Sequence, residues 1–171
     1  MSDFLEKLEK VNTFIFDIDG VLTSGRVFLT ANGEQLRSML VKDGYAIQYA
    51  IKQGYNIAVI SGGSSQSVKP RLKYLGIKDI YIGSKNKVKD FEEFLEDKKI
   101  HAEQVVYMGD DIPDYYVMQL CGVKTCPKNA APEILAISDY ISDKKGGEGC
   151  ARDIIEKVLR LHNKWFKPEN I

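Results

Sequence analysis

The sequence predicts an α/β fold: a Rossmann-like, doubly wound and mostly parallel sheet with helices on both faces. Short apolar runs bounded by Gly, Asp or Ser alternate along the chain with longer segments of helical period. The apolar runs are nearly continuous, which is typical of strands buried on both faces. With 171 residues, 44% of them hydrophobic and 28% charged, we expect one compact domain over residues 1–171.

The expected strands are short and rich in Ile, Val, Tyr or Phe. In chain order they span residues 13–19, 56–61, 79–82, 104–109, 123–126 and, least clearly, 140–142.

The expected helices show apolar residues on one stripe. Gly54 and Gly76 stand where two of these helices would end, and Pro70 fits only a first helical turn. The helices span residues 45–53, 68–75, 88–95 and 151–162.

One segment breaks the alternation of strands and helices. Asn32-Gly33 joins the strand-like runs 26–30 and 34–41, and Asn-Gly in this setting predicts a β-hairpin. We expect this hairpin, about residues 26–41, to project from the carboxyl edge of the sheet. The tail after the last helix, about residues 163–171, contains Trp165 and Phe166 and is a candidate for docking on a neighbouring molecule.

Composition narrows the class of partner. The 24 basic and 24 acidic side chains cancel and form no basic run, which argues against nucleic acid or an acidic membrane surface. No apolar run approaches the ~18 residues of a membrane span. Cys121, Cys126 and Cys150 form no CxxC pair, and no secretory leader is visible, so we expect free thiols and a cytoplasmic protein that acts on a small molecule.

Carboxylates follow two of the expected strands. Asp17 and Asp19 end the first strand, at the edge where open parallel sheets bind ligands. Asp110, Asp111 and Asp114 follow the fourth strand and reach the same edge. Crowded carboxylates repel unless a cation neutralises them, and Mg²⁺ prefers oxygen ligands. The alternative to a metal site is that these aspartates only cap loops.

Two further segments could hold an anion. The second strand ends in Ser61-Gly62-Gly63, a hydroxyl followed by residues whose backbone N–H groups can approach an oxyanion closely. Lys87 opens the third expected helix, where its ammonium could meet a phosphate.

These four segments, in this order, resemble the four motifs of the haloacid dehalogenase superfamily of phosphatases, and the match covers the whole chain. The resemblance implies that Asp17 attacks phosphorus to form an aspartyl-phosphate, and that Asp19 protonates the leaving oxygen and then activates water. It also implies a Mg²⁺ held by Asp17, the backbone carbonyl of Asp19 and Asp110. It further implies that Ser61, the Gly62 amide and Lys87 bind the phosphoryl group. Asp111 and Asp114 would support the metal site, and Asp19 and Gly63 would contact the substrate.

Several shorter stretches of the sequence resemble the capless subfamily of 3-deoxy-D-manno-octulosonate 8-phosphate phosphatases. The stretches that carry this likeness are Asn32-Gly33-Glu34, Lys42-Asp43-Gly44-Tyr45, Arg71 before Leu75-Gly76-Ile77, Gly109-Asp110-Asp111, and Gly146-Gly147-Glu148-Gly149 before Arg152. The resemblance implies no cap domain, a role in lipopolysaccharide biosynthesis, and a homotetramer in which a neighbouring subunit covers the active site. It also implies that Lys42, Asp43, Gly44 and Arg71 contact the sugar acid or shape its pocket.

Two positions bear on the substrate. Gln48 and Gly63 stand where the enteric-type enzymes have arginines. Phosphatases of the nine-carbon sugar-acid 9-phosphate usually have an acidic residue at the position of Gly63, so its absence favours the eight-carbon acid. Alternatives remain open: a phosphatase of the nine-carbon acid or another small ester, and a non-catalytic oligomeric partner of a nucleotide-sugar enzyme. A receiver-type signalling domain fits poorly, because Asp17 lies in the first strand.

Overall fold

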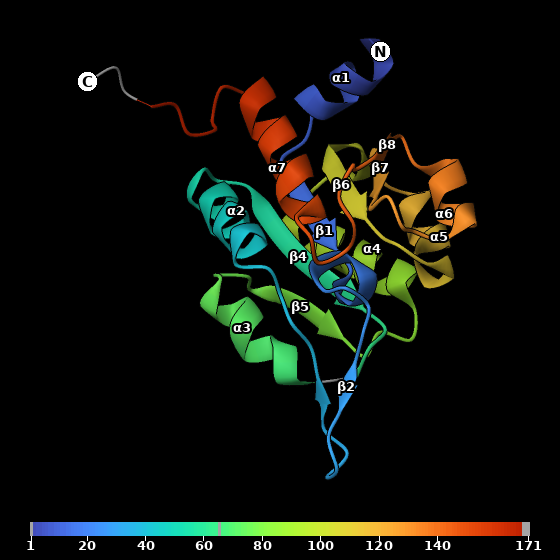
Figure 1. Ribbon diagram of the computed structural model, residues 1–171. Helices are drawn as coiled ribbons and strands as arrows, with labels where there is room; N and C mark the ends of the chain where they lie inside the picture. Colours follow the sequence, from blue (N-terminus) through green and yellow to red (C-terminus); the bar gives the residue numbers. More distant parts are fainter. Residues whose placement is uncertain (1, 65, 169–171) are drawn as a thin grey trace.

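A computed structural model describes residues 2–64 and 66–168, and its centre is a parallel six-stranded sheet of order β5-β4-β1-β6-β7-β8 (Figure 1). The strands are β1 (Thr13–Phe16), β4 (Asn56–Ser61), β5 (Asp79–Ile82), β6 (Val105–Met108), β7 (Val123–Cys126) and β8 (Tyr140–Ile141). The strand order reverses at β1, the position where doubly wound sheets bind ligands. The expected α/β fold is therefore confirmed.

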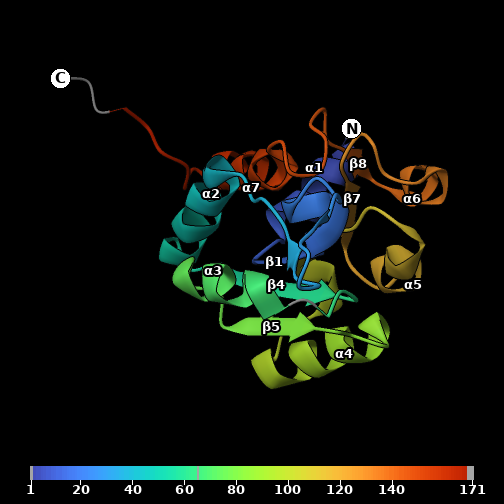
Figure 2. The same ribbon diagram turned by 60° about the horizontal axis from the view of Figure 1, so that its bottom comes forward.

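Helices cover both faces of this sheet (Figure 2). One face packs against α1 (Ser2–Glu9), α2 (Val41–Lys52), α3 (Lys69–Tyr74) and α7 (Cys150–Leu161). The other face packs against α4 (Lys87–Lys98), α5 (Tyr115–Met118) and α6 (Pro132–Ile137). All of these helices are too short or too polar to cross a membrane.

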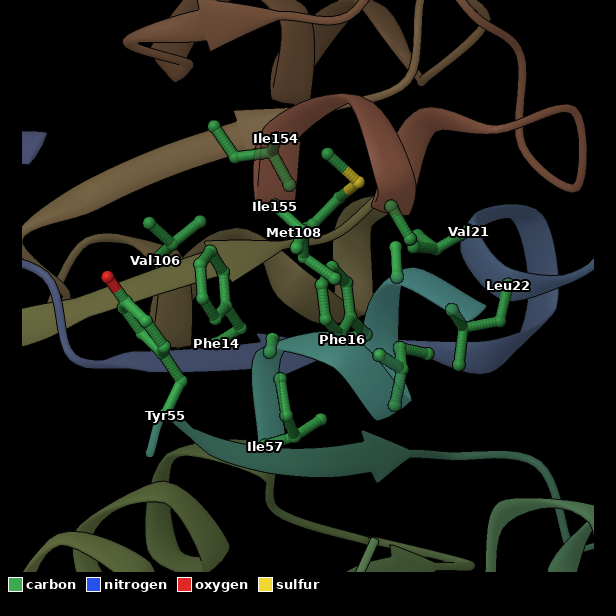
Figure 3. Packing of buried hydrophobic residues seen from close by; sticks show 14 of the residues in the cluster. Phe14, Phe16, Val21, Leu22, Tyr55, Ile57, Val106, Met108, Ile154 and Ile155 are labelled. Carbon is green, nitrogen blue, oxygen red and sulfur yellow. The ribbon is translucent and has the colours of Figure 1, made fainter. Parts of the chain in front are cut away.

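Side chains of β1 show why the strand needs apolar residues at every position. Phe14 and Phe16 point to one core and Ile15 points to the other, and all three are fully buried. Burying each such side chain stabilises the fold by ~1.5–3 kcal/mol. Figure 3 shows the two rings between Ile57 of β4 and Ile155 of α7, so this face joins the sheet to the C-terminal helix.

The first strand is shorter than expected. It ends at Phe16, and residues Ile18–Leu22 form the tight turn η1, in which Asp19 and Gly20 have non-helical backbone angles and Gly20 has φ of +83°. The expected strand 13–19 therefore extends three residues too far. The two carboxylates at its end, Asp17 and Asp19, lie at a turn and line a hollow that a ligand can enter.

The hairpin projects from the body of the molecule as a separate two-stranded sheet (Figure 1). Its strands, β2 (Phe28–Leu29) and β3 (Gln35–Leu36), are much shorter than the runs 26–30 and 34–41. The second run was expected to continue to residue 41, but Val41 opens α2, which begins four residues earlier than predicted. Between β1 and β4 the chain forms η1, this hairpin and α2, and no cap domain is present among the described residues.

The α-helices α1, α5 and α6 had no counterpart in the sequence prediction. In the tail, Trp165 is buried and its ring lies 4.9 Å from that of Tyr49 in α2. This part of the tail therefore docks on its own chain, whereas Phe166 is exposed. Residues 169–171 of the expected tail lie outside the described part of the chain.

Candidate active site

The register of the sheet brings the acidic segments together. Phe16 of β1 pairs with Val59 of β4 on one side and with Met108 of β6 on the other. The residues that follow these strands therefore lie side by side at the carboxyl edge. As expected from chain order alone, Asp17, Ser61 and Asp110 meet there.

The turn η1 holds Asp17 and shapes the floor of the site. Asp17 Oδ1 accepts a hydrogen bond from the backbone N–H of Ile18 at 2.7 Å. A Cβ on Gly20 would lie 1.8 Å from Asp110 Oδ2, so only glycine fits this close approach. The loop before α7 clamps the turn from outside, because the Gly147 N–H donates to the Val21 carbonyl at 2.8 Å.

Lys87, the first residue of α4, lies between two buried carboxylates. Its Nζ is 3.0 Å from Asp17 Oδ2 and 2.7 Å from Asp114 Oδ1. Burial lowers the pKa of Lys87, but the charges of Asp17 and Asp114 outweigh that effect and the net pKa is raised. The ammonium therefore stays charged at the bottom of the site.

Asp114 acts as a brace behind this lysine. It is fully buried, and its Oδ1 also accepts from the Tyr107 hydroxyl at 2.9 Å. Its Oδ2 accepts from the backbone N–H of Asp110 at 3.2 Å, which fixes the loop that carries Asp110. Burial and the charge of Asp114 raise the pKa of Tyr107 well above its usual value, so its hydroxyl remains a donor. This geometry agrees with the supporting role expected for Asp114.

The pKa values of Asp17 and Asp110 are raised because several carboxylates lie close together in a buried place. Burial and the charge of Asp114 raise the pKa of Asp17 to about 6, although Lys87 opposes the shift. Burial and the charges of Asp17, Asp114 and Asp111 raise the pKa of Asp110 to about 7. Lys87 alone therefore leaves this cluster short of positive charge.

This shortage makes the cluster suitable for a cation. Carboxylate oxygens of Asp17, Asp110 and Asp114 lie within 4.8 Å of one another. A set of hard oxygen donors of this kind fits Mg²⁺. Asp114 lies behind the hollow and is held by Lys87, Tyr107 and the Asp110 amide, whereas Asp17 and Asp110 line the hollow and are the side chains placed to face a metal.

The loop after β4 forms the opposite wall. Ser61 is buried, and its Oγ accepts from the Gly63 N–H at 3.3 Å. The Ser61 and Gly63 carbonyls accept from the N–H groups of Ser84 and Gly83, at 3.0 and 2.9 Å. These bonds fix the loop at a distance that lets its backbone line the site.

Asp19 faces this loop from η1, and an arginine that the sequence analysis did not single out holds it. Arg37 Nε donates to Asp19 Oδ1 at 2.7 Å, and its Nη2 donates to Oδ2 at 3.0 Å. Arg37 lies one residue beyond β3, 18 residues from Asp19. Only the path of the hairpin brings the two together, so spacing along the chain gave no signal.

The assembled site is a hollow of about 320 Å³. Its lining consists of Asp17, Asp19, Gly25, Ser61, Gly62, Gly63, Lys87, Asp110, Asp111 and Pro113. Eight of these were expected from the sequence; Gly25 and Pro113 were not. The set supplies a buried carboxylate, an ammonium and small backbone segments around one space, which suits phosphoryl transfer.

Asp114 lies behind this hollow, and the four residues expected to contact the sugar acid also lie outside its lining. Lys42 lines a separate hollow at the start of α7. Asp43 is buried and its Oδ1 accepts from the Arg152 N–H at 2.8 Å, so it caps that helix. Burial raises the pKa of Asp43 to about 6, against opposing hydrogen bonds. Arg71 lines a third hollow with Arg37, and its Nη2 lies 2.8 Å from where a Cβ on Gly44 would stand.

Comparison with known proteins gives a consistent set of relatives. A family model described as haloacid dehalogenase-like hydrolase matches residues 77–154. The 3-deoxy-D-manno-octulosonate 8-phosphate phosphatase of Escherichia coli (strain K12) is 34% identical over 163 residues, which cover 95% of this chain and 87% of that protein.

Solved structures agree with the sequence match. The Moraxella catarrhalis phosphatase of the same name, crystallised with magnesium ion, phosphate ion and a KDO molecule, has a TM-score of 0.92 and 31% identity. That match covers 95% of this chain and 94% of the other. The cobalt-bound phosphatase from Haemophilus influenzae has a TM-score of 0.88 and 31% identity, and the match covers 92% of each chain.

Proposed function

The chain belongs to the 3-deoxy-D-manno-octulosonate 8-phosphate phosphatases of the haloacid dehalogenase-like hydrolases, and we propose that it hydrolyses that sugar-acid phosphate. It is a phosphoric monoester hydrolase that uses Mg²⁺. One observation carries the mechanism: the buried Asp17 carboxylate faces the hollow beside Lys87, with Asp19 and the Ser61–Gly63 loop on its rim.

In the first step, an Asp17 carboxylate oxygen attacks phosphorus. The bond from phosphorus to the ester oxygen breaks, its electron pair stays on that oxygen, and Asp19 in its acid form supplies the proton. Lys87 and the Ser61–Gly63 loop stabilise charge on the other phosphoryl oxygens. The product is an aspartyl-phosphate on Asp17 and a free alcohol.

In the second step, water attacks the phosphorus of the aspartyl-phosphate. Asp19, now ionised, takes a proton from the water, and the bond between phosphorus and the Asp17 oxygen breaks. The electron pair returns to the Asp17 carboxylate, and inorganic phosphate leaves. The two aspartates thus divide the work: Asp17 exchanges the phosphoryl group and Asp19 exchanges the proton.

Asp17, Asp110 and the backbone carbonyl of Asp19 would hold the Mg²⁺, with Asp111 and Asp114 in support. When bound, Mg²⁺ supplies neutralisation of phosphoryl charge and orientation of the phosphate. The raised pKa values of Asp17 and Asp110 support this assignment, because burial and mutual repulsion oppose full ionisation of the cluster and a cation would relieve that repulsion.

We further propose a cytoplasmic homotetramer of single-domain subunits in lipopolysaccharide biosynthesis, in which a neighbour covers the site. Phe28 and Leu29 of the hairpin are 64% and 77% exposed, which supports burial by another subunit. Lys42, Asp43, Gly44 and Arg71 would then contact the sugar acid or shape the pocket in the assembly, at some distance from Asp17.

The test is Mg²⁺-dependent phosphate release from three substrates: the eight-carbon sugar-acid 8-phosphate, the nine-carbon 9-phosphate and simple sugar phosphates. We expect strong preference for the eight-carbon acid, and loss of activity and of acid-trapped phosphoenzyme in Asp17→Asn. Asp97→Asn, an exposed aspartate on α4, is the matched control and should behave as the wild type.

Each outcome separates a different part of the proposal. Equal activity on all esters would keep the mechanism and contradict the substrate. Preference for the nine-carbon acid would move the chain to that sister activity. No Mg²⁺-dependent hydrolysis of any ester would favour the non-catalytic partner.

A further inference from the structure

Arg37 reaches from the base of the hairpin to Asp19 across the rim of the catalytic hollow. Its two donors meet the two carboxylate oxygens at 2.7 and 3.0 Å. The Arg37 side chain is 5% exposed and that of Asp19 is 33% exposed. A two-pronged pair of this kind fixes both the position and the plane of a carboxylate.

The two oxygens of Asp19 differ in what they can still accept. Oδ1 takes the Arg37 Nε and also the Thr23 hydroxyl at 3.3 Å. Oδ2 takes the Arg37 Nη2 and lies 3.1 Å from where a Cβ on Gly63 would stand. Because Gly63 lines the hollow, Oδ2 is the oxygen placed to exchange a proton with substrate or water.

The element that carries Arg37 has little packing of its own. Strands β2 and β3 have two residues each, and all four side chains are exposed. A two-stranded hairpin alone is marginally stable. The base of the hairpin is joined to the body by the Arg37–Asp19 pair and by a hydrogen bond from Ser67 Oγ to the Gln35 carbonyl at 3.3 Å.

We propose that Arg37 is a positioning residue for Asp19, and that it acts in the hydrolysis of the aspartyl-phosphate; the inference rests on the proposed function. The guanidinium fork holds both oxygens of the carboxylate that takes the proton of the attacking water, so the position and plane of that carboxylate are fixed before the water attacks. With Arg37 in place, Oδ2 is aimed at the space beside Gly63 where that water must stand. Without Arg37, the side-chain hydrogen bond that remains on this carboxylate, among the residues that the structure describes, is that of the Thr23 hydroxyl to Oδ1.

The test compares Arg37→Met and Arg37→Lys with Arg160→Met. Arg160 is the matched control, because its Nη2 donates to Glu156 at 2.9 Å on an exposed helix face. The readouts are kcat, KM and the fraction of enzyme trapped as phosphoenzyme by acid quench, with the eight-carbon sugar-acid 8-phosphate and Mg²⁺. Thermal unfolding of each variant reports the fold.

For Arg37→Met we expect kcat to fall about 10- to 100-fold while KM stays within about threefold, since general acid–base positioning acts on the chemical steps. The trapped phosphoenzyme should increase, because the second step is slowed. Arg37→Lys keeps the positive charge but loses the two-pronged contact, so its kcat should lie between those of the wild type and Arg37→Met. The kcat, KM and trapped phosphoenzyme of Arg160→Met should match those of the wild type. If Arg37→Met does not fold, the lysine variant carries the same comparison.

Two results would overturn the inference. An unchanged kcat with unchanged phosphoenzyme would show that Asp19 needs no help from Arg37. A raised KM with kcat retained would make Arg37 a substrate ligand. Both differ from an inactive wild type, which would contradict the proposed function itself.

Discussion

At the scale of single residues, the main feature of the site is an excess of negative charge over positive charge. Lys87 is within 3.0 Å of two buried carboxylates, and Asp110 lies close by on the same edge. Removing this ammonium would leave buried charges unpaired, which costs ~3–5 kcal/mol. A bound cation supplies the missing charge, so metal binding and stability are linked at this site.

This linkage predicts a pH dependence of stability. The pKa of Asp17 is raised from 3.8 to about 6 and that of Asp110 from 3.8 to about 7. Between about pH 4 and pH 7 the metal-free folded protein therefore holds more protons than the unfolded chain, so its free energy of unfolding falls as pH rises. Mg²⁺ competes with those protons, and the stabilisation it gives should grow across the same range.

The measurement is thermal unfolding with EDTA and with excess Mg²⁺ at pH 5, 6, 7 and 8. We expect a gain of a few degrees at pH 8, about 2–4 °C for each kcal/mol, and little gain at pH 5. Asp110→Asn should lose most of the gain. Asp43→Asn is the control, because the raised pKa of Asp43 affects the EDTA series and leaves the Mg²⁺ increment intact. An equal Mg²⁺ gain at pH 5 and pH 8 would contradict the linkage.

Residue spacing predicted which side chains meet at the carboxyl edge of the sheet. It did not predict the contact from Arg37 that fixes the position of Asp19. Asp17, Asp19, Lys87 and Asp110 follow strands or open a helix, so the sheet fixes where they lie. Arg37 arrives on a hairpin whose path depends on tertiary contacts, which a single sequence does not encode locally.

At the scale of elements, strand and helix positions followed from hydrophobic period, while turns did not. The expected strands 56–61, 79–82 and 123–126 agree with β4, β5 and β7 residue for residue. The predicted first strand, 13–19, was too long because Ile18 continues the apolar pattern, although Ile18 belongs to η1. The turn after β1 brings Gly20 against Asp110, a contact between segments far apart in the chain.

Gly20→Ala tests that contact. Both a φ of +83° and a Cβ 1.8 Å from Asp110 Oδ2 oppose any side chain there. We expect a loss of ~1–3 kcal/mol from backbone strain, together with loss of the Mg²⁺-induced rise in Tm, because Asp110 is pushed aside. Gly54→Ala is the matched control: its φ is +88° with nothing within 4 Å, so it should lose stability and keep the metal response. The same Mg²⁺ response in both variants would count against a tight turn around Asp110.

At the scale of the whole molecule, the hairpin stands apart from a body that is otherwise one covered sheet. It exposes Phe28 and Leu29, and its base carries Arg37 to the active site. If hairpins of several subunits pack together, the same contact that buries their apolar residues also steadies Arg37. Assembly and catalysis would then depend on one element.

Leu29→Asp should therefore reduce the size of the particle in solution and lower kcat. A charge buried at a subunit interface costs several kcal/mol, enough to dissociate the hairpins at micromolar concentration. Light scattering coupled to size exclusion measures the mass, and phosphate release measures the activity. Leu120→Asp, at another exposed leucine, is the control and should change neither. A wild type that is monomeric, or a Leu29→Asp variant of unchanged mass, would rule out the hairpin as the contact.

The contacts of Gly147 and Cys150 with the Val21 carbonyl also determine how early in its synthesis the chain can form a complete active site. Cys150 Sγ contacts the Val21 carbonyl at 3.3 Å across 129 residues of chain, and the Gly147 amide donates to the same carbonyl. A ribosome adding about 5–20 residues per second needs roughly ten seconds to pass from one side of this contact to the other. A nascent chain that already contains every catalytic carboxylate therefore lacks the clamp on its nucleophile turn, and activity should appear only once α7 has emerged.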